Sequence, residues 1–345
     1  MSTSAVPEQK SPSAVASGAG FGAPQAEFAA LVGGCGLFEL ADRARIMLAG
    51  KDRVRWLNGM ISNKIRDLAA GQGVYAFVLN PQGHVLGDLY AYNRGESLLV
   101  ETGQAQLEKL LAIFKRYIIM DDVRLENLEG QMTAVGIAGP KSGAVLQSAG
   151  FQLPELGPLH FLELPWGDGK VVVVRSDNPG VESFEFWLPP PQLPAVRDAL
   201  VSAGATQVGS HARELLRIAS GIPRYGQDIQ ERDLPQETEQ QRALNFNKGC
   251  YIGQEIVERI RSRGAVHRKF SGFLVEGPLP AAGVKIQADG KDVGEITSSA
   301  FLPLAGGEGP VALGYLRREA AEKTLNAAGA RLSLSSLPFP RVFEH

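Results

Sequence analysis

One of the two cysteines of this 345-residue chain lies in the run KGCYIGQE, which spans Lys248 to Glu255. Apolar residues recur at helical spacing from Ile252 onward, so we expect a helix here, with Cys250 at or just before its first turn. The positive end of a helix dipole and the ammonium of Lys248 both favour a thiolate over a thiol. A thiolate attacks electrophiles, exchanges disulfides or binds soft metals.

A free cysteine can also serve as a small buried hydrophobe, and the spacing alone leaves this alternative open for Cys250. The second cysteine, Cys35, lies far away in the sequence, and no CxxC pair or histidine-rich cluster accompanies either one. A structural zinc site and a disulfide framework are therefore not expected. The five histidines are scattered, and nothing in the sequence supports a Cys-His hydrolase pair.

The composition is that of an ordinary globular protein, with 44% hydrophobic residues, 21% charged residues and a net charge of -2. This charge provides no long-range attraction for nucleic acid, and we expect no nucleic-acid partner. No apolar run approaches the roughly 20 residues needed to span a bilayer, so we expect no membrane association and a cytoplasmic location. Residues 1–26 are rich in Ser, Ala, Gly and Pro and are predicted to be a disordered tail.

The chain after this tail is predicted to be an α+β body followed by an all-β part. The turn NPQG at residues 80–83 favours a hairpin between strands at Val74–Leu79 and Val85–Tyr92. Apolar residues at helical spacing predict a helix over Leu107–Ile118. After Arg263 short strands alternate with Gly and Pro, which is typical of a small antiparallel barrel or sandwich. The predicted divisions are 1–26, 27–130, 131–262 and 263–345.

The run KGCYIGQE resembles the signature of the YgfZ-type folate-binding proteins of iron–sulfur cluster assembly and repair, relatives of the glycine cleavage T-protein (aminomethyltransferase). The resemblance continues in SGIPRYGQDIQERDLPQET upstream and in LFELADRARIMLAGKDRVRWLNGM near the N-terminus, and covers the chain from Leu37 to its end. It implies a three-domain ring, with two α/β sub-domains and a C-terminal antiparallel β-barrel. It also implies a central cavity that binds tetrahydrofolate.

The same resemblance implies two carboxylates for the pterin of the folate. Glu185 stands where family members place a pterin-binding glutamate, because a carboxylate suits the amino and ring N–H donors. Gly87-Asp88 stands where T-proteins carry two aspartates, so one acid of the pair is missing. As plain alternatives, Asp88 could lie on the solvent face of its strand and Glu185 could pair across the sheet.

Three more residues are assigned to the sites. Arg217 is expected to bind the glutamyl tail of the folate, since a guanidinium suits a carboxylate, although it could instead be an ion-paired helix residue. Tyr251 is placed in the folate site, and Lys248 is placed beside Cys250 in the reactive site.

Three functions follow from these residues. The first is a tetrahydrofolate-binding accessory factor that serves iron–sulfur client or assembly proteins through the thiol of Cys250. The second is a folate-dependent aminomethyl or one-carbon transferase, so the sequence leaves open whether the protein is an enzyme. The third is a folate-binding module without chemistry. The cysteine of the motif and the broken aspartate pair favour the first function over the second.

Overall fold

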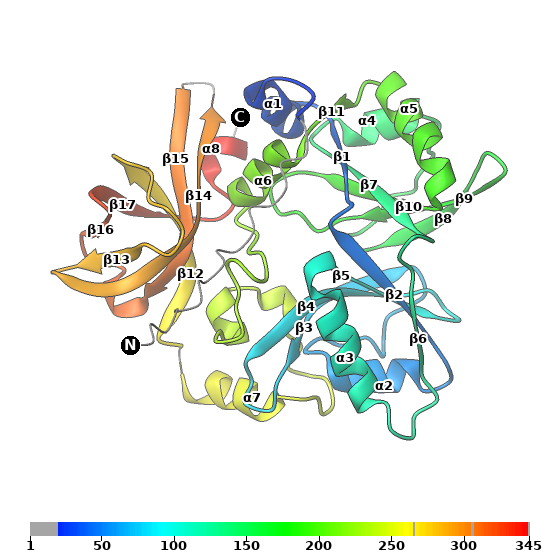
Figure 1. Cartoon of the computed structure of the whole chain (residues 1–345), viewed down its shortest axis with the longest axis horizontal. Coiled ribbons are helices and arrows are strands. Elements are labelled where there is room, and N and C mark those ends of the chain that lie inside the picture. The colour runs from blue at the N-terminus through cyan, green and yellow to red at the C-terminus, as the bar shows by residue number, and fades with distance from the viewer. Residues whose placement is uncertain (1–19, 265, 305–306, 344–345) are drawn as a thin grey trace, which may run out of the picture.

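The computed structural model describes residues 20–264, 266–304 and 307–343. Figure 1 shows three groups of elements around a common centre: a unit built on a five-stranded sheet, a unit built on a six-stranded sheet, and a closed barrel. This arrangement confirms the predicted fold of two α/β units and a C-terminal antiparallel barrel.

The first unit contains the five-stranded sheet, in the order β3-β4-β5-β2-β6. Its elements are β2 (Arg43–Ala49), α2 (Arg53–Met60), β3 (Gln72–Leu79), β4 (Val85–Asn93), β5 (Leu98–Gly103), α3 (Leu107–Tyr117) and β6 (Arg124–Asn127). The β3–β4 hairpin and helix α3 occur where the sequence predicts them. The apolar side of α3 is buried with one face of the sheet, as its helical spacing requires.

The second unit contains the six-stranded sheet, in the order β11-β1-β7-β10-β9-β8. Its strands are β1 (Gly36–Glu39), β7 (Thr133–Ala138), β8 (Phe161–Trp166), β9 (Gly169–Arg175), β10 (Ser183–Leu188) and β11 (Thr206–Gln207). Its helices are α1 (Pro24–Gly33), α4 (Ser142–Ser148), α5 (Leu193–Ser202) and α6 (Ser210–Ala219).

The N-terminal part of the chain differs from the predicted divisions. Helix α1 begins at Pro24, inside the predicted tail, because Phe28 and Leu31 on this helix are buried in the core. Strand β1 pairs with β7 and β11, so residues 24–39 belong to the second unit. The remainder of the predicted tail, residues 1–19, lies outside the described residues.

The segment that carries the cysteine motif also packs differently from the predicted division. It contains the short helices η3 (Pro235–Thr238) and η4 (Gln241–Ala243), followed by α7 (Gln254–Arg263). Hydrogen bonds from the motif reach the end of α2 in the first unit, including Lys248 Nζ to the Asn58 carbonyl at 2.6 Å. The motif therefore lies on the first unit rather than within the second.

The barrel closes in the order β12-β15-β14-β13-β16-β17, with antiparallel pairing between its neighbouring strands. Its strands are β12 (Arg268–Glu276), β13 (Lys285–Ala288), β14 (Lys291–Leu304), β15 (Gly307–Arg317), β16 (Leu325–Ala327) and β17 (Ala330–Ser335). Short helices at η5 (Arg318–Ala320) and α8 (Pro340–Phe343) complete this part. The turn Asp289-Gly290 between β13 and β14 has positive φ at both residues, as a two-residue hairpin turn requires.

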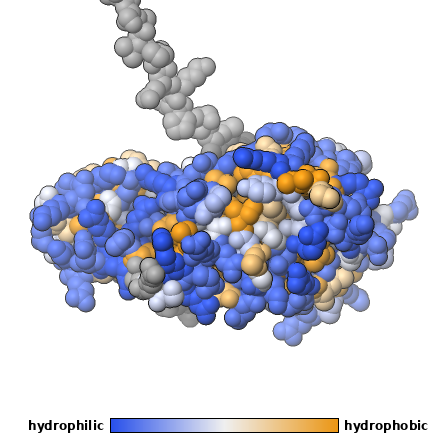
Figure 2. Space-filling view, turned by 90° about the horizontal axis from the view of Figure 1, so that it is seen from below, coloured by the Kyte–Doolittle hydropathy of each residue, from blue (hydrophilic) through white to orange (hydrophobic). Residues whose placement is uncertain are grey.

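Seen from below, the molecule presents a mostly hydrophilic surface on which a few hydrophobic side chains gather (Figure 2). The most exposed large hydrophobic side chains among the described residues are Ile119 and Met120, in the loop after α3. Within the described part of the chain, no helix is both long enough and apolar enough to cross a membrane.

Candidate functional site

Asp88 lies on β4 and its carboxylate is held by two neighbours. Its Oδ2 accepts a hydrogen bond of 2.7 Å from the hydroxyl of Tyr75, and its Oδ1 accepts one of 2.7 Å from the side-chain amide of Gln106. The side chain is half-buried. Because a carboxylate has four lone-pair directions, Asp88 keeps acceptor capacity for a ligand while its orientation is fixed.

Glu185 lies on β10 and points toward charged groups of the first unit. Its Oε2 accepts a hydrogen bond of 2.9 Å from the indole of Trp187. Burial raises the pKa of Glu185 to about 7, with a further contribution from the nearby carboxylate of Glu101, while Arg43 and Arg45 act in the opposite direction. A carboxyl group poised near neutral pH in a largely desolvated position is a common feature of functional sites.

The first and second units together supply one polar site that contains both predicted carboxylates. Burial lowers the pKa of Arg43, but the pKa is raised overall because Glu101, Tyr90, Glu185 and Asp88 all lie near its guanidinium. The Nε of Arg43 lies 3.5 Å from a Glu101 oxygen, and its guanidinium lies 5.4 Å from the ring centroid of Tyr90. The structure brings Asp88 and Glu185 to the same site from strands of different sheets.

Besides Arg43, Tyr75 and Gln106, three more residues of this site were missed by the sequence reasoning. Arg242 places its guanidinium 4.4 Å from the ring centroid of Tyr75 and pairs with Asp177. The hydroxyl of Tyr90 donates to the same Asp177 over 3.2 Å. These residues come from η4, from the loop after β9 and from β4, so no local spacing in the sequence could have grouped them.

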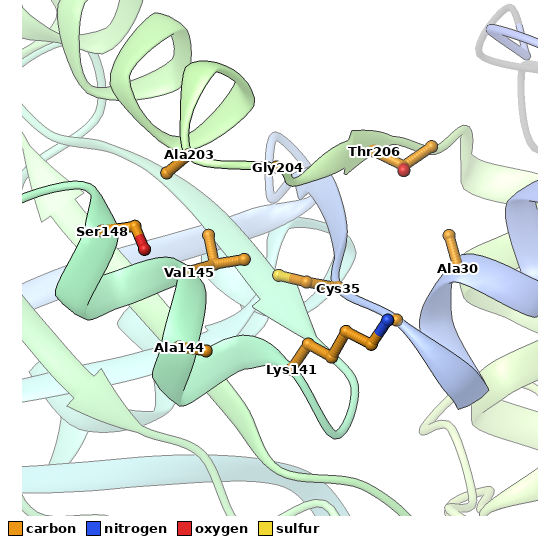
Figure 3. Close-up of a pocket in the computed structure, with 10 residues that line it drawn as sticks. Ala30, Cys35, Lys141, Ala144, Val145, Ser148, Ala203, Gly204 and Thr206 are labelled. Atoms are coloured by element: carbon orange, nitrogen blue, oxygen red, sulfur yellow. The ribbon is translucent and has the colours of Figure 1, made fainter.

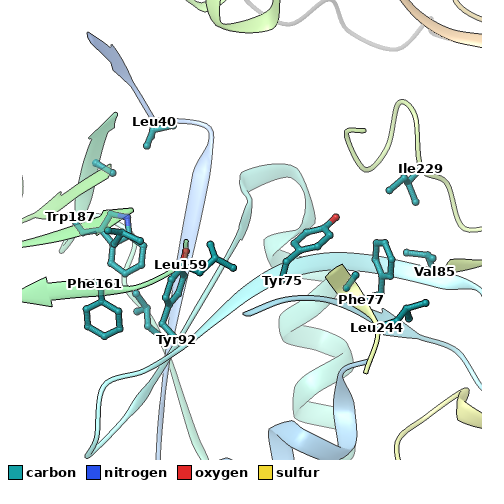
Figure 4. Close-up of a cluster of buried hydrophobic side chains, with 14 of the residues drawn as sticks. Leu40, Tyr75, Phe77, Val85, Tyr92, Leu159, Phe161, Trp187, Ile229 and Leu244 are labelled. Atoms are coloured by element: carbon teal, nitrogen blue, oxygen red, sulfur yellow. The ribbon is translucent and has the colours of Figure 1, made fainter. Parts of the chain in front are cut away.

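A cluster of buried aromatic and aliphatic side chains supports the polar site from both sheets (Figure 4). Tyr92 of β4 packs edge to face on Trp187 of β10, with ring centroids 4.8 Å apart. Trp187 is fully buried, and the Arg45 guanidinium lies 5.3 Å from its ring. This packing fixes the first unit against the second and thereby the position of Glu185 relative to Asp88.

Arg217 does not belong to this site, contrary to the prediction from the sequence. Its guanidinium donates five hydrogen bonds, which reach the side chains of Glu214, Asp228 and Ser298 and the carbonyl of Ile222. A guanidinium has five N–H donors, so none is left for a folate carboxylate. Arg217 is an ion-paired helix residue that ties α6 to strand β14 of the barrel.

Cys250 is exposed, which excludes the buried-hydrophobe alternative for this cysteine. It lies four residues before Gln254, where α7 begins, so the predicted position just before a helix is confirmed. Gly253 has a φ of +82°, and a Cβ atom there would lie 2.6 Å from the carbonyl oxygen of Asn80. Glycine is therefore required where the loop turns into the helix.

Lys248 is buried, and its hydrogen bonds are made to backbone carbonyls of the first unit. Its ammonium donates to the carbonyls of Asn58 at 2.6 Å, Ile61 at 2.5 Å and Asn63 at 2.8 Å. These bonds use its three donors at the carboxyl end of α2, where helix carbonyls lack partners within the helix. Burial lowers the pKa of Lys248 to about 7. Lys248 anchors the loop from inside while Cys250 lies outside.

Tyr251 is a buried residue of the core cluster that also contains Tyr75. Its ring is buried, and the ring centroid lies 4.6 Å from the ammonium of Lys248. Burial raises the pKa of its hydroxyl to about 12. Lys248 and Tyr251 are buried and the two residues between them are exposed, so the motif places two side chains inward and the thiol outward.

The other cysteine, Cys35, lies beside a separate pocket of about 370 Å³ between α1 and α4 (Figure 3). Its thiol accepts a contact of 3.7 Å from the Ser142 hydroxyl, and burial raises its pKa. A raised pKa favours the unreactive thiol form. Cys35 is therefore a structural cysteine.

These units define a class of protein that is known from a solved structure. The crystal structure of glycine cleavage system aminomethyltransferase T from Bartonella henselae matches 92% of this chain and 89% of its own chain, with a TM-score of 0.82 and 25% sequence identity. The fold is thus of the aminomethyltransferase T type.

Within this class, the chain belongs to the family described as the GCVT N-terminal domain, whose model matches residues 13–248. Residues 260–339 match a second model, described as the CAF17 C-terminal beta-barrel domain. An aminomethyltransferase from Rubrobacter xylanophilus is 32% identical over 82% of this chain and 76% of its own length. One from Thermosipho melanesiensis is 26% identical over 89% of this chain and 86% of its own length.

Proposed function

We propose that this protein is a tetrahydrofolate-binding accessory factor for the assembly or repair of iron–sulfur clusters, with Cys250 as its reactive thiol. The observation that carries the proposal is the exposure of Cys250 on a loop that the buried Lys248 anchors to α2. An exposed thiol at a fixed position can be reached by a group on another protein. The match of the barrel to the CAF17 type supports the YgfZ-type interpretation of the motif.

The polar site has the donor and acceptor groups that tetrahydrofolate requires. The pterin carries amino and ring N–H donors, and the carboxylates of Glu185 and Asp88 can accept from them. Tyr75 and Tyr90 add aromatic surface beside Asp88, with ring centroids 5.0 Å apart. Arg43 faces the same site and takes the place that the sequence assigned to Arg217 as a cation for a folate carboxylate. The GCVT membership supports folate as the ligand.

Two measurements test this proposal. Titration calorimetry should detect tetrahydrofolate binding, and Cys250→Ser should bind the ligand with unchanged affinity. In cells that lack the native protein, Cys250→Ser should fail to restore iron–sulfur enzyme activity, whereas the matched control Cys35→Ser should restore it. Absence of binding heat would exclude the folate part. Full rescue by Cys250→Ser would exclude the thiol part and favour a folate-binding module without chemistry.

A second candidate is a folate-dependent aminomethyltransferase, which the names of the similar proteins support. The environment of Gly87 weighs against it. A Cβ at Gly87 would lie 2.9 Å from both Gln106 Oε1 and Leu110 Cδ2, so an aspartate beside Asp88 would require these two side chains to shift. An assay for methylenetetrahydrofolate formation from an aminomethylated carrier protein distinguishes the candidates, because the accessory factor should give no product above background.

A further inference from the structure

The stretch of residues 58–63 at the end of α2 forms hydrogen bonds to the segment that carries the motif. The hydroxyl of Ser62 donates to the Ala243 carbonyl over 2.6 Å, and the backbone N–H of Ile252 donates to Gly59 over 3.2 Å. The three bonds from Lys248 end on the same stretch. Residues 242–252 are therefore held as one segment by the end of α2.

The opposite side of this stretch is bonded to β3, the strand that carries Tyr75. The backbone N–H of Ser62 donates to the Phe77 carbonyl at 2.9 Å, and the N–H of Phe77 donates to the Ser62 hydroxyl at 2.8 Å. Tyr75 in turn donates to Asp88. The polar site and the Cys250 loop are thus attached to two sides of one stretch of backbone.

Asn63 lies where these two sets of contacts meet. Its side-chain amide donates to the Tyr75 carbonyl at 2.8 Å and to the Arg242 carbonyl at 2.7 Å. Its own backbone carbonyl accepts the bond of 2.8 Å from Lys248. Asn63 is only 8% exposed, so these groups have no water to replace a lost partner.

We infer that Asn63 is a positioning residue that couples the Cys250 loop to the polar site. A ligand seated against Asp88 restrains Tyr75 and Arg242, which Asn63 holds through their carbonyls. The same residue holds Lys248, so restraint on one side reduces opening on the other. The inference rests on tetrahydrofolate as the ligand of this site.

Hydrogen exchange of the backbone amides tests the coupling, because the N–H of Asn245 bonds to Ser62 and that of Ile252 bonds to Gly59. Saturating tetrahydrofolate should slow exchange in residues 245–252 of the natural protein at least fivefold, the lower range of typical couplings. In Asn63→Ala this slowing should fall below twofold while amides of β3 remain protected by the ligand. Lys248→Met removes the hydrogen bond from Lys248 to the Asn63 carbonyl and should reduce the ligand-dependent slowing in the same way. This second variant tests the inference if Asn63→Ala does not fold.

Asn93→Ala is the matched control. Asn93 lies on β4, in the same sheet as β3, and its side-chain amide also donates to a backbone carbonyl, that of Leu68. This variant should keep the ligand-dependent slowing.

Equal slowing in Asn63→Ala and the natural protein, or no slowing in the natural protein at saturation, would overturn the inference. If tetrahydrofolate gives no binding heat, the proposed function fails instead. In that case, ligand-free exchange of residues 245–252 at least fivefold faster in Asn63→Ala than in Asn93→Ala would still support the positioning role, and equal rates would overturn it.

Discussion

Trp187 donates a hydrogen bond of 2.9 Å from its indole nitrogen to the carboxylate of Glu185, two residues earlier on β10. Because side chains two residues apart on a strand lie on the same face, the fully buried indole holds the carboxylate over the polar site. The bond is one of the interactions that favour ionisation of Glu185, and burial outweighs them.

Glu185→Gln should stabilise the protein at pH 8 and leave its stability unchanged near pH 4. The pKa of Glu185 is about 7 in the folded protein and about 4.3 in an unfolded chain. The folded state therefore binds the proton more tightly, and stability is lost as the pH rises from the unfolded to the folded pKa. After allowance for partial exposure, the gain at pH 8 should be about 1–3 kcal/mol. Urea unfolding at both pH values measures it; a loss of stability at pH 8 would contradict the prediction.

The affinity for tetrahydrofolate should rise between pH 6 and pH 8, because the pterin donors require the ionised form of Glu185, whose pKa is about 7. Glu185→Gln should remove this rise and weaken binding by about tenfold at pH 8, equivalent to about 1.4 kcal/mol. Calorimetry at both pH values provides the measurement. An affinity that does not depend on pH in the natural protein would show that Glu185 does not contact the ligand through its carboxylate.

Gly253→Ala should destabilise the protein by about 1–3 kcal/mol, because an alanine there must adopt a positive φ and its Cβ meets the Asn80 carbonyl. Gly249→Ala is the matched control in the same loop. No atom lies within 4 Å of a Cβ at Gly249, and its φ is not in the left-handed region. Thermal unfolding should separate the two variants, and equal melting temperatures would refute the requirement for glycine at residue 253.

Arg217→Met should lower the free energy of unfolding by about 3–5 kcal/mol, because it leaves the fully buried carboxylate of Asp228 without its cation. If the variant folds, its affinity for tetrahydrofolate should match that of the natural protein. Arg317→Met, which removes an exposed arginine 3.8 Å from Glu319, should change stability by less than about 1 kcal/mol. Loss of folate binding in a folded Arg217→Met protein would restore the role that the sequence suggested.

A chain that starts at residue 20 should melt at the temperature of the full chain, whereas one that starts at Glu27 should melt several degrees lower. The shorter chain lacks the first turn of α1. It also lacks the backbone N–H groups of Phe21 and Gly22, which donate to the buried Glu27 at 2.6 and 2.7 Å. Loss of both partners leaves a buried acceptor unsatisfied. Identical melting of the two chains would show that this turn does not contribute to stability.

Local patterns in the sequence were sufficient for much of the fold. The turn at residues 80–83 predicted the β3–β4 hairpin, and the apolar spacing over 107–118 predicted α3, because both elements depend on neighbours in sequence. Helix α1 was missed because it begins within a stretch of small residues and Pro. Its burial depends on distant partners, such as the Gly209 N–H that donates to Glu27 at 2.8 Å.

The site was predictable only where a motif carried it. The family resemblance pointed to Asp88 and Glu185, which share one polar site. It could not distinguish Arg217, whose donors are all used within the protein, from Arg43 and Arg242, which face the site from other segments. Whether a charged side chain is already paired depends on tertiary contacts, and the spacing of residues contains no such information.

The anchor of the cysteine loop has a consequence for how the protein is made. Lys248 bonds to residues that precede it by 190, 187 and 185 positions. During synthesis from the N-terminus, the carbonyls at the end of α2 therefore lack their partner, Lys248, until more than half of the chain has been made. Such distant contacts form late in folding, since the long intervening chain must be ordered first. The first unit and the Cys250 loop thus reach their final packing together. A fragment that ends before residue 248 lacks the lysine that joins them.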